Sequence, residues 1–200
     1  MSKQAFFDVL KDRRSMYVLS RESTVSDERI QELVEEAVMH APTAFNSQST
    51  RAVVLLGNQH DKLWDITTEA LRKVVPEDRF ASTQEKMDMF RSSYGTVLFF
   101  NDESVIEYLQ KEYDLYADKF PIWAEQGTGI LQYAVWTSFT AEGLGATLQH
   151  YNPLIDEKVK NEWGIPSSWK LTGQMPFGKP AAPAGEKQFN AIEDRVKVYK

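Results

Sequence analysis

The sequence predicts an α/β or α+β domain with much helix, and three observations carry this prediction. Apolar residues recur at helical spacing over 27–41, compact runs of β-forming residues occupy 51–57 and 96–100, and helical and strand patterns alternate along the chain. No linker-like composition interrupts this pattern. We therefore expect a single domain over residues 1–200, in which 178–200 form an extended C-terminal arm rich in Pro and Ala.

Two helices are expected before the first strand. The segment 3–12 places four apolar residues near one helical face. Ser26 is a suitable N-cap for the second helix, and the acidic Asp27 and Glu28 fall in its first turn, where the helix dipole favours negative charge. Pro42 should end this helix, because proline has no N–H to donate and its ring clashes with the preceding turn.

The middle of the chain is expected to form two strands separated by helical segments. The first buried strand is predicted at 51–57 and a helix at about 62–75. The charged segment 77–93 keeps a few apolar anchors, which indicates a helix, with a mobile lid as the alternative. A second buried strand follows at 96–100 and a helix at about 103–113.

The last third begins with a long helix, expected over 123–144. Apolar residues surround most of its circumference, which predicts burial nearly all round, either in a core or between subunits. A strand is then expected at 145–149, a short helix at 155–163 and a strand at 169–177.

Composition excludes several classes of protein. The chain has 200 residues, of which 42% are apolar and 26% charged, as in an ordinary globular domain. The net charge of −6 argues against general affinity for nucleic acid. It has no cysteine, no secretion signal pattern at its N-terminus and no apolar run of membrane-spanning length, so we expect a cytoplasmic protein without a membrane partner.

The sequence also lacks the common motifs for binding metals and nucleotides. No HExxH or GxSxG motif occurs, and the three histidines do not cluster, so we expect no metal site. There is no P-loop and no complete GxGxxG after a strand. An anionic cofactor would therefore have to be held mainly by side chains.

Polar segments that could hold such a ligand stand out from the rest of the chain. Arg13-Arg14-Ser15 suits a phosphate, because guanidinium groups present a planar fork of donors; a solvated basic helix end is the alternative. The connection 41–50, APTAFNSQST, could face a planar ligand or simply bond its own backbone. The segment 149–153 could reach a ligand from a strand end or form an ordinary Asn-Pro turn.

Taken together and in order, these segments resemble the nitroreductase family of FMN-dependent NAD(P)H oxidoreductases. The family pattern has an RRSxR-like segment, a helix ending in A-P-S-x-x-N-x-Q, a long central helix, an L-G strand and an arm that crosses onto the partner subunit. The corresponding segments here are Arg13-Arg14-Ser15-Met16-Tyr17, Ala41-Pro42-Thr43-Ala44-Phe45-Asn46-Ser47-Gln48, Gly143-Leu144-Gly145-Ala146-Thr147-Leu148-Gln149 and Met175-Pro176-Phe177-Gly178-Lys179-Pro180. The sequence departs from the pattern at Tyr17, at Thr43 and at Ser49-Thr50, where the family usually has Arg, Ser and Pro-Trp.

The resemblance implies a set of cofactor and substrate residues. The phosphate and ribityl chain would be bound near Arg13, the flavin ring would be approached by 42–48 of the other subunit, and backbone N–H groups of 149–152 would lie near its N5 and O4 atoms. The implied cofactor-binding residues are Arg13, Arg14, Ser15, Tyr17, Pro42, Thr43, Ala44, Asn46, Gln48, Gln149, His150, Tyr151, Asn152, Lys187 and Arg195. The candidate substrate-pocket residues are Phe45, Phe120 and Trp123, for which core packing or loop anchoring is the alternative.

The resemblance further implies an α+β fold, with a mixed sheet flanked by helices, in an intertwined homodimer. The implied activity is hydride transfer from NAD(P)H through FMN to nitroaromatic or quinone-type acceptors in ping-pong order, with the flavin carrying the chemistry. Two alternatives remain. The first is a flavin-binding regulatory or stress-response module with little turnover, and the second is a helical interaction protein without a cofactor.

Overall fold

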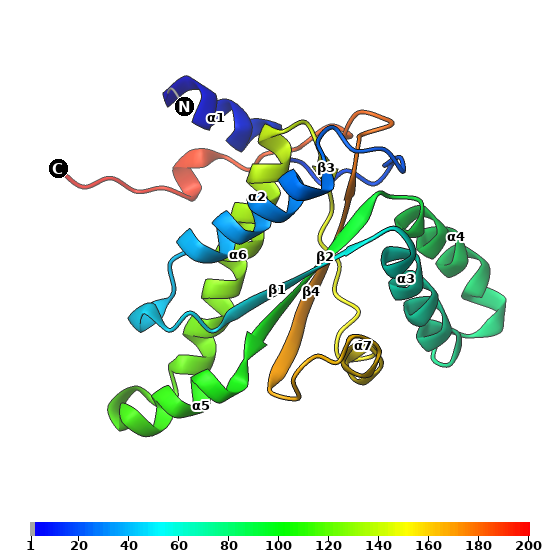
Figure 1. Ribbon diagram of the computed structural model, residues 1–200. Coiled ribbons are helices and arrows are strands. Elements are labelled where there is room, and N and C mark those ends of the chain that lie inside the picture. The colour runs from blue at the N-terminus through cyan, green and yellow to red at the C-terminus, as the bar shows by residue number, and fades with distance from the viewer. Residues whose placement is uncertain (1–2) are drawn as a thin grey trace.

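The computed structural model describes residues 3–200 and has the α+β architecture expected from the sequence (Figure 1). The helices are α1 (Lys3–Asp12), α2 (Asp27–His40), α3 (Gly57–Arg72), α4 (Phe80–Arg91), α5 (Glu103–Glu112), α6 (Phe120–Ala141) and α7 (Asp156–Trp163). The strands are β1 (Thr50–Leu56), β2 (Gly95–Asp102), β3 (Gly145–Ala146) and β4 (Trp169–Gly178). Short 3₁₀ turns occur at Ala44–Asn46, Glu77–Arg79, Asp114–Tyr116 and Ile192–Asp194.

The sheet has the strand order β1-β2-β4-β3, and each pair of neighbouring strands is antiparallel. The resemblance implies a mixed sheet, but the parallel pairing among residues 3–200 is limited to one isolated bridge, between Ser15 and Ala146. Strand β1 lies at one edge of the sheet and pairs only with β2 among the described residues. Its other edge is therefore free in this chain.

Strand β2 organises the core because it is buried along its whole length. Successive side chains of a strand point to opposite faces of the sheet. Val97 and Phe99 accordingly pack with residues of α2 and α6, while Leu98 and Phe100 pack with residues of α3, α4 and α7. Figure 1 shows these two groups of helices on opposite sides of the sheet.

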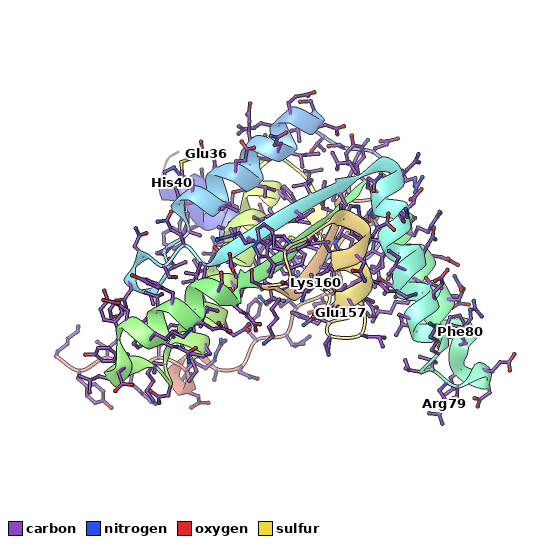
Figure 2. All side chains as sticks on the ribbon, turned by 60° about the horizontal axis from the view of Figure 1, so that its bottom comes forward. Glu36, His40, Arg79, Phe80, Glu157 and Lys160 are labelled. Atoms are coloured by element: carbon purple, nitrogen blue, oxygen red, sulfur yellow. The ribbon has the colours of Figure 1, made fainter. Side chains whose placement is uncertain are left out.

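The segment considered as a possible lid is a helix that packs against its neighbour. Phe80, Met87 and Phe90 of α4 are buried, the last two in the core cluster that contains Trp64 of α3. Figure 2 shows Arg79 and Phe80 at the far end of the projecting α3–α4 pair. Helix α3 itself begins at Gly57, five residues before the expected start at 62.

Two further expectations need correction. The strand expected at 145–149 is regular only at Gly145–Ala146, because the chain then leaves the ladder and returns to β4 through an isolated bridge at Gln149. Helix α6 starts at Phe120, with Pro121 in its first turn where proline is well tolerated, and it ends at Ala141. Within a single chain α6 is not buried all round, since Ile130 and Tyr133 are exposed.

Two ion pairs within helices lie on the surface. Glu36 and His40 lie one turn apart on α2 and pair at 3.3 Å, and Glu157 and Lys160 of α7 pair at 3.7 Å (Figure 2). Among residues 3–200, no helix combines the length and apolar character needed to cross a membrane.

His60 is buried in the first turn of α3 and is held in a neutral form. Its Nε2 lies 3.2 Å from the Arg91 carbonyl, which can only accept, so Nε2 carries the hydrogen. Its Nδ1 then accepts from the Thr96 hydroxyl at 2.9 Å, while Trp64 Nε1 donates to the same oxygen at 3.1 Å. Burial lowers the pKa of His60 to about 4.

This burial predicts an acid-sensitive fold. The unfolded chain binds the proton at about pH 6.5, and the folded chain binds it only near pH 4. The free energy of unfolding should therefore fall by about 3 kcal/mol as the pH is lowered from 6.5 to 4. Urea unfolding at a series of pH values measures it. His60→Gln should remove this part of the pH dependence, whereas His40→Gln, at the exposed partner of Glu36, should retain it. An unchanged slope in His60→Gln would contradict the assignment.

Candidate functional site

The basic segment after α1 is fastened beside β3. Met16 N donates to Ala146 O at 2.9 Å, which fixes Ser15 against the same strand. The Arg13 guanidinium lies over the Trp136 ring at 4.5 Å, and Arg14 Nη2 donates to Gly185 O of the C-terminal arm at 2.6 Å. The chain therefore gathers two guanidinium groups and a hydroxyl where β3, α6 and the arm meet.

The segment 149–152 is held beside β4 by one residue that sequence reasoning missed, Gln174. Its backbone exchanges hydrogen bonds with Gln149 at 2.7 and 2.9 Å. Its buried side chain accepts from Tyr151 N through Oε1 at 2.7 Å and donates to Asn152 Oδ1 at 3.4 Å. Within the described part of the chain, the N–H groups of His150 and Asn152 have no protein acceptor. These two groups are the backbone donors of this segment that remain for a ligand.

Gln174 should therefore matter for stability. Gln174→Leu leaves the partly buried Tyr151 N–H without its acceptor, which costs about 1–3 kcal/mol of unfolding free energy. Urea unfolding checks this value. Gln84→Leu on α4 is a matched control, because its exposed side-chain contacts with Arg72 and Asp88 should change stability by no more than about 0.5 kcal/mol. Equal stability of the two variants would show that Gln174 does not hold the segment.

The connection 41–50 adopts a strained backbone. Phe45, Asn46 and Gln48 have φ values of 57°, 49° and 49°, in the left-handed region; asparagine tolerates it, whereas Phe45 and Gln48 enter it at a cost of about 1–2 kcal/mol each. Thr43 holds the turn closed, since its Oγ1 accepts from Gln48 N at 3.0 Å and its carbonyl accepts from Asn46 N at 3.0 Å. Arg51 also donates to the Gln48 carbonyl.

The strained turn directs Phe45 into a group of aromatic rings that we call the aromatic cluster. Its centroid lies 5.0 to 6.1 Å from four other rings, and its plane is within 18° of parallel to that of Trp123. The cluster consists of Phe45, Tyr113, Tyr116, Phe120 and Trp123. Sequence reasoning included three of these residues and missed Tyr113 and Tyr116. The available sequence signal was spacing: Tyr113, Tyr116, Phe120 and Trp123 follow one another at intervals of three, four and three residues. Such intervals place side chains on one face of a helix.

The basic segment at Ser15 and the connection 42–48 lie near opposite ends of helix α2. The start of α2 is near β3, since Thr24 Oγ1 donates to Glu142 O at 2.7 Å and Arg29 pairs with Glu142 at 2.7 Å. The end of α2 leads directly into the connection 41–50 (Figure 1). A helix of 14 residues is about 21 Å long. Because Ser15 pairs with Ala146 of β3, residues 42–48 are separated from Ser15 within one chain by about the length of α2.

The remaining candidates are exposed. Tyr17 and His150 have open side chains, and Lys187 lies over the Phe189 ring at 5.1 Å. Gly185 brings the arm to Arg14, two residues before Lys187, but no side-chain contact of Arg195 occurs within residues 3–200. Lys179 pairs with Glu22 at 2.8 Å. No three His, Asp or Glu side chains of the described chain are grouped to hold a metal ion.

The structure defines a helix-flanked antiparallel α+β domain that gathers two guanidinium groups and a hydroxyl beside β3 and leaves two loop N–H groups free after Gln149. The sequence model of the nitroreductase family matches residues 10–179. The chain therefore belongs to the nitroreductase family, and it is an oxidoreductase of that family.

Relatives of known sequence and structure cover nearly the whole chain. HBN1 of Saccharomyces cerevisiae is 37% identical over 198 residues, which are 97% of this chain and 96% of the yeast protein. CinD, a nitroreductase from Lactococcus lactis solved in complex with chloramphenicol, is 47% identical, with a TM-score of 0.90 over 98% of this chain and 100% of its own. The FMN-dependent nitroreductase NfnB from Mycobacterium smegmatis, solved with NADPH, shares the fold at 15% identity, with a TM-score of 0.76 over 98% of this chain and 99% of its own.

Proposed function

We propose that the chain is an FMN-dependent oxidoreductase that passes hydride from NAD(P)H to nitroaromatic or quinone-type acceptors in ping-pong order. The observation that carries the proposal is a set of donors along one stretch of the chain: two guanidinium groups and the Ser15 hydroxyl beside β3, and the free N–H groups of His150 and Asn152 after Gln149, which pairs with Gln174 of β4. Support also comes from the relatives. CinD was solved with chloramphenicol, and NfnB, which shares the fold, is FMN-dependent.

This donor set fits FMN in charge and in hydrogen bonding. Arg13, Arg14 and Ser15 would hold the dianionic phosphate and the start of the ribityl chain, because Arg offers a rigid fork of donors to phosphate oxygens. Trp136 Nε1, beneath Arg13, is buried without a partner among the described residues, so this corner still has an unused donor. Lys187 and Arg195 would add positive charge from the arm.

The segment 149–152 would lie along the flavin ring. The N–H groups of His150 and Asn152 would donate to ring acceptors and stabilise negative charge that develops there, because fixed donors need not reorganise during reaction. When bound, FMN supplies the redox chemistry, taking hydride from the nicotinamide and passing electrons to the acceptor. This chain's residues would position both partners, with Gln174 fixing the wall on which the ring rests.

The site would be completed by a second copy of the chain. Since 42–48 are separated from Ser15 by about the length of α2, these residues would approach the flavin bound to the partner, as the family resemblance implies. A homodimer also gives the exposed face of α6 and the free edge of β1 a partner surface.

The C-terminal arm is suited to cross onto that partner. A groove of about 740 Å³ runs between α2 and β1, lined by apolar side chains, by the acidic Asp27, Glu28 and Glu35, and by one basic residue, Arg51. The arm ends in Arg195-Val196-Lys197-Val198-Tyr199-Lys200, which alternates charged and exposed apolar residues. This pattern suits a strand laid in an acidic, half-apolar groove.

The departures from the family pattern do not favour a module without turnover. Ser49 and Thr50, which stand where the family usually has Pro-Trp, are 1% and 3% exposed. Ser49 O accepts from Asp102 N at 2.8 Å, so this pair belongs to the folded core. The substitution therefore leaves the proposed ligand groups of this chain intact.

A steady-state experiment tests the proposal. Protein reconstituted with FMN should bind one flavin per chain and oxidise NADH or NADPH with nitrobenzene or benzoquinone. Double-reciprocal plots at several acceptor concentrations should be parallel, as a ping-pong order requires. Intersecting lines would refute the order, and bound FMN without turnover of any acceptor would favour the regulatory module.

A further inference from the structure

The aromatic cluster has an open face that its own packing does not require. Phe120 is 3% exposed and anchors the group, whereas Phe45, Tyr113 and Tyr116 are 50%, 41% and 46% exposed. Exposed aromatic residues gathered in one place usually mark a binding surface. Three parts of the chain bring these rings together: the strained turn after α2, the connection between α5 and α6, and the first turn of α6.

The hydroxyl groups of the two tyrosines are free. Tyr94 shows the usual arrangement, since its hydroxyl donates to Asp27 Oδ1 at 2.5 Å. Within residues 3–200, neither Tyr113 nor Tyr116 has a hydrogen-bond partner for its hydroxyl. Each can donate one hydrogen bond, so the cluster has two unused donors attached to half-exposed rings.

The cluster is also continuous with 42–48, the stretch proposed to approach the flavin bound to the partner subunit. Phe45 lies between Ala44 and Asn46, which belong to the stretch expected at the isoalloxazine. The left-handed backbone at Phe45 and Asn46 fixes the ring relative to that stretch, because few other conformations are open to a bulky residue there. A molecule on the open face would therefore meet the flavin edge at a defined position.

We propose that Tyr113 and Tyr116 determine the acceptor specificity of this site. Their hydroxyls donate hydrogen bonds to the oxygens of a flat aromatic acceptor, such as a nitrobenzene or a benzoquinone, while the rings of Phe45 and Trp123 pack against its ring plane. The acceptor class follows from the surface: ring planes select a flat molecule, and two free donors select one that carries acceptor oxygens. This proposal rests on the proposed function and names residues that the family pattern did not supply.

The test compares acceptors on the FMN-loaded dimer. Tyr113→Phe/Tyr116→Phe keeps the rings and removes both hydroxyls, so kcat/KM for nitrobenzene and benzoquinone should fall about tenfold, mainly through KM. FMN content, reduction by NAD(P)H and turnover of ferricyanide, which has no aromatic ring, should be unchanged. Tyr108→Phe, an exposed tyrosine of α5 outside the cluster, is the matched control and should behave as the parent.

The outcomes separate this proposal from the function on which it rests. A yellow, active parent whose double variant keeps its kcat/KM for aromatic acceptors would overturn the proposal alone. An equal loss with ferricyanide would also overturn it, because the hydroxyls would then act on flavin binding or fold. A colourless parent that cannot take up FMN would remove the proposed function, and this proposal with it.

Discussion

Replacing Arg13 and Arg14 together by alanine should abolish stable FMN binding. Each guanidinium would contribute a charge-assisted hydrogen bond to the phosphate, about 1.5–3 kcal/mol, so the two losses should raise the dissociation constant at least a hundredfold. Flavin fluorescence during titration of the apoprotein measures this constant directly. The parent should bind one FMN per chain, and the double variant should be purified without colour.

Controls separate lost phosphate contacts from lost structure. Arg13 packs on Trp136 and Arg14 donates to Gly185, so the double variant could also loosen the arm. Arg14→Lys keeps the charge but not the planar fork, and its affinity should lie between those of parent and double variant. Arg79→Ala/Lys86→Ala removes two positive charges from the distant α4 segment and should bind FMN as the parent does. Equal affinity of the parent and the Arg13/Arg14 variant would place the phosphate elsewhere.

Removing residues 186–200 should convert the dimer into monomers and empty the flavin site. The proposed crossing of the arm would bury Val196, Val198 and Tyr199, which are exposed in a single chain. Burying these side chains would contribute on the order of 4 kcal/mol per arm, and truncation removes both arms, so dimerisation should weaken at least about a thousandfold. Sedimentation velocity gives the oligomeric state, and the circular dichroism of the truncated chain should remain that of the folded domain, because β4 ends at Gly178.

A point variant provides the finer version of this test. Val196→Asp/Val198→Asp keeps the full length of the arm but puts negative charge against a groove that already contains Asp27, Glu28 and Glu35. It should reproduce the effect of truncation, whereas Lys200→Ala should leave the dimer intact. A truncated chain that remains dimeric with full FMN content would show that the arm does not hold the two subunits together.

The elements with strong periodic signals were predictable from the sequence. Helix α2 begins one residue after the expected N-cap, and Ser26 Oγ accepts from Arg29 N at 3.3 Å. Strand β2 was predictable because its run of apolar residues is buried on both faces. The start of α3 was missed, since Gly57-Asn58 has the composition of a turn, and only the tertiary burial of His60 shows why the helix begins there.

The candidate site was predictable only in part, because some of its residues are defined by tertiary contacts. Arg13-Arg14-Ser15 and the connection 41–50 stand out by composition, and the structure fixes both in defined positions. Gln174 could not be ranked, because its role depends on contacts between segments that are distant in the sequence. Tyr113 and Tyr116 had a spacing signal, but their packing against Phe45 depends on the same kind of contact. The separation of Ser15 from 42–48 by the length of α2 is likewise a property of the fold. It makes dimerisation part of the functional proposal.

Anaerobic titration of the FMN-loaded protein tests the central claim most directly. Stepwise addition of NADH or NADPH should bleach the flavin absorbance with one nicotinamide per flavin, and a nitroaromatic or quinone added afterwards should restore it. This result would establish both halves of the proposed reaction in one cuvette. A protein that remains colourless after reconstitution with FMN, or whose bound flavin neither nicotinamide reduces, would contradict the account.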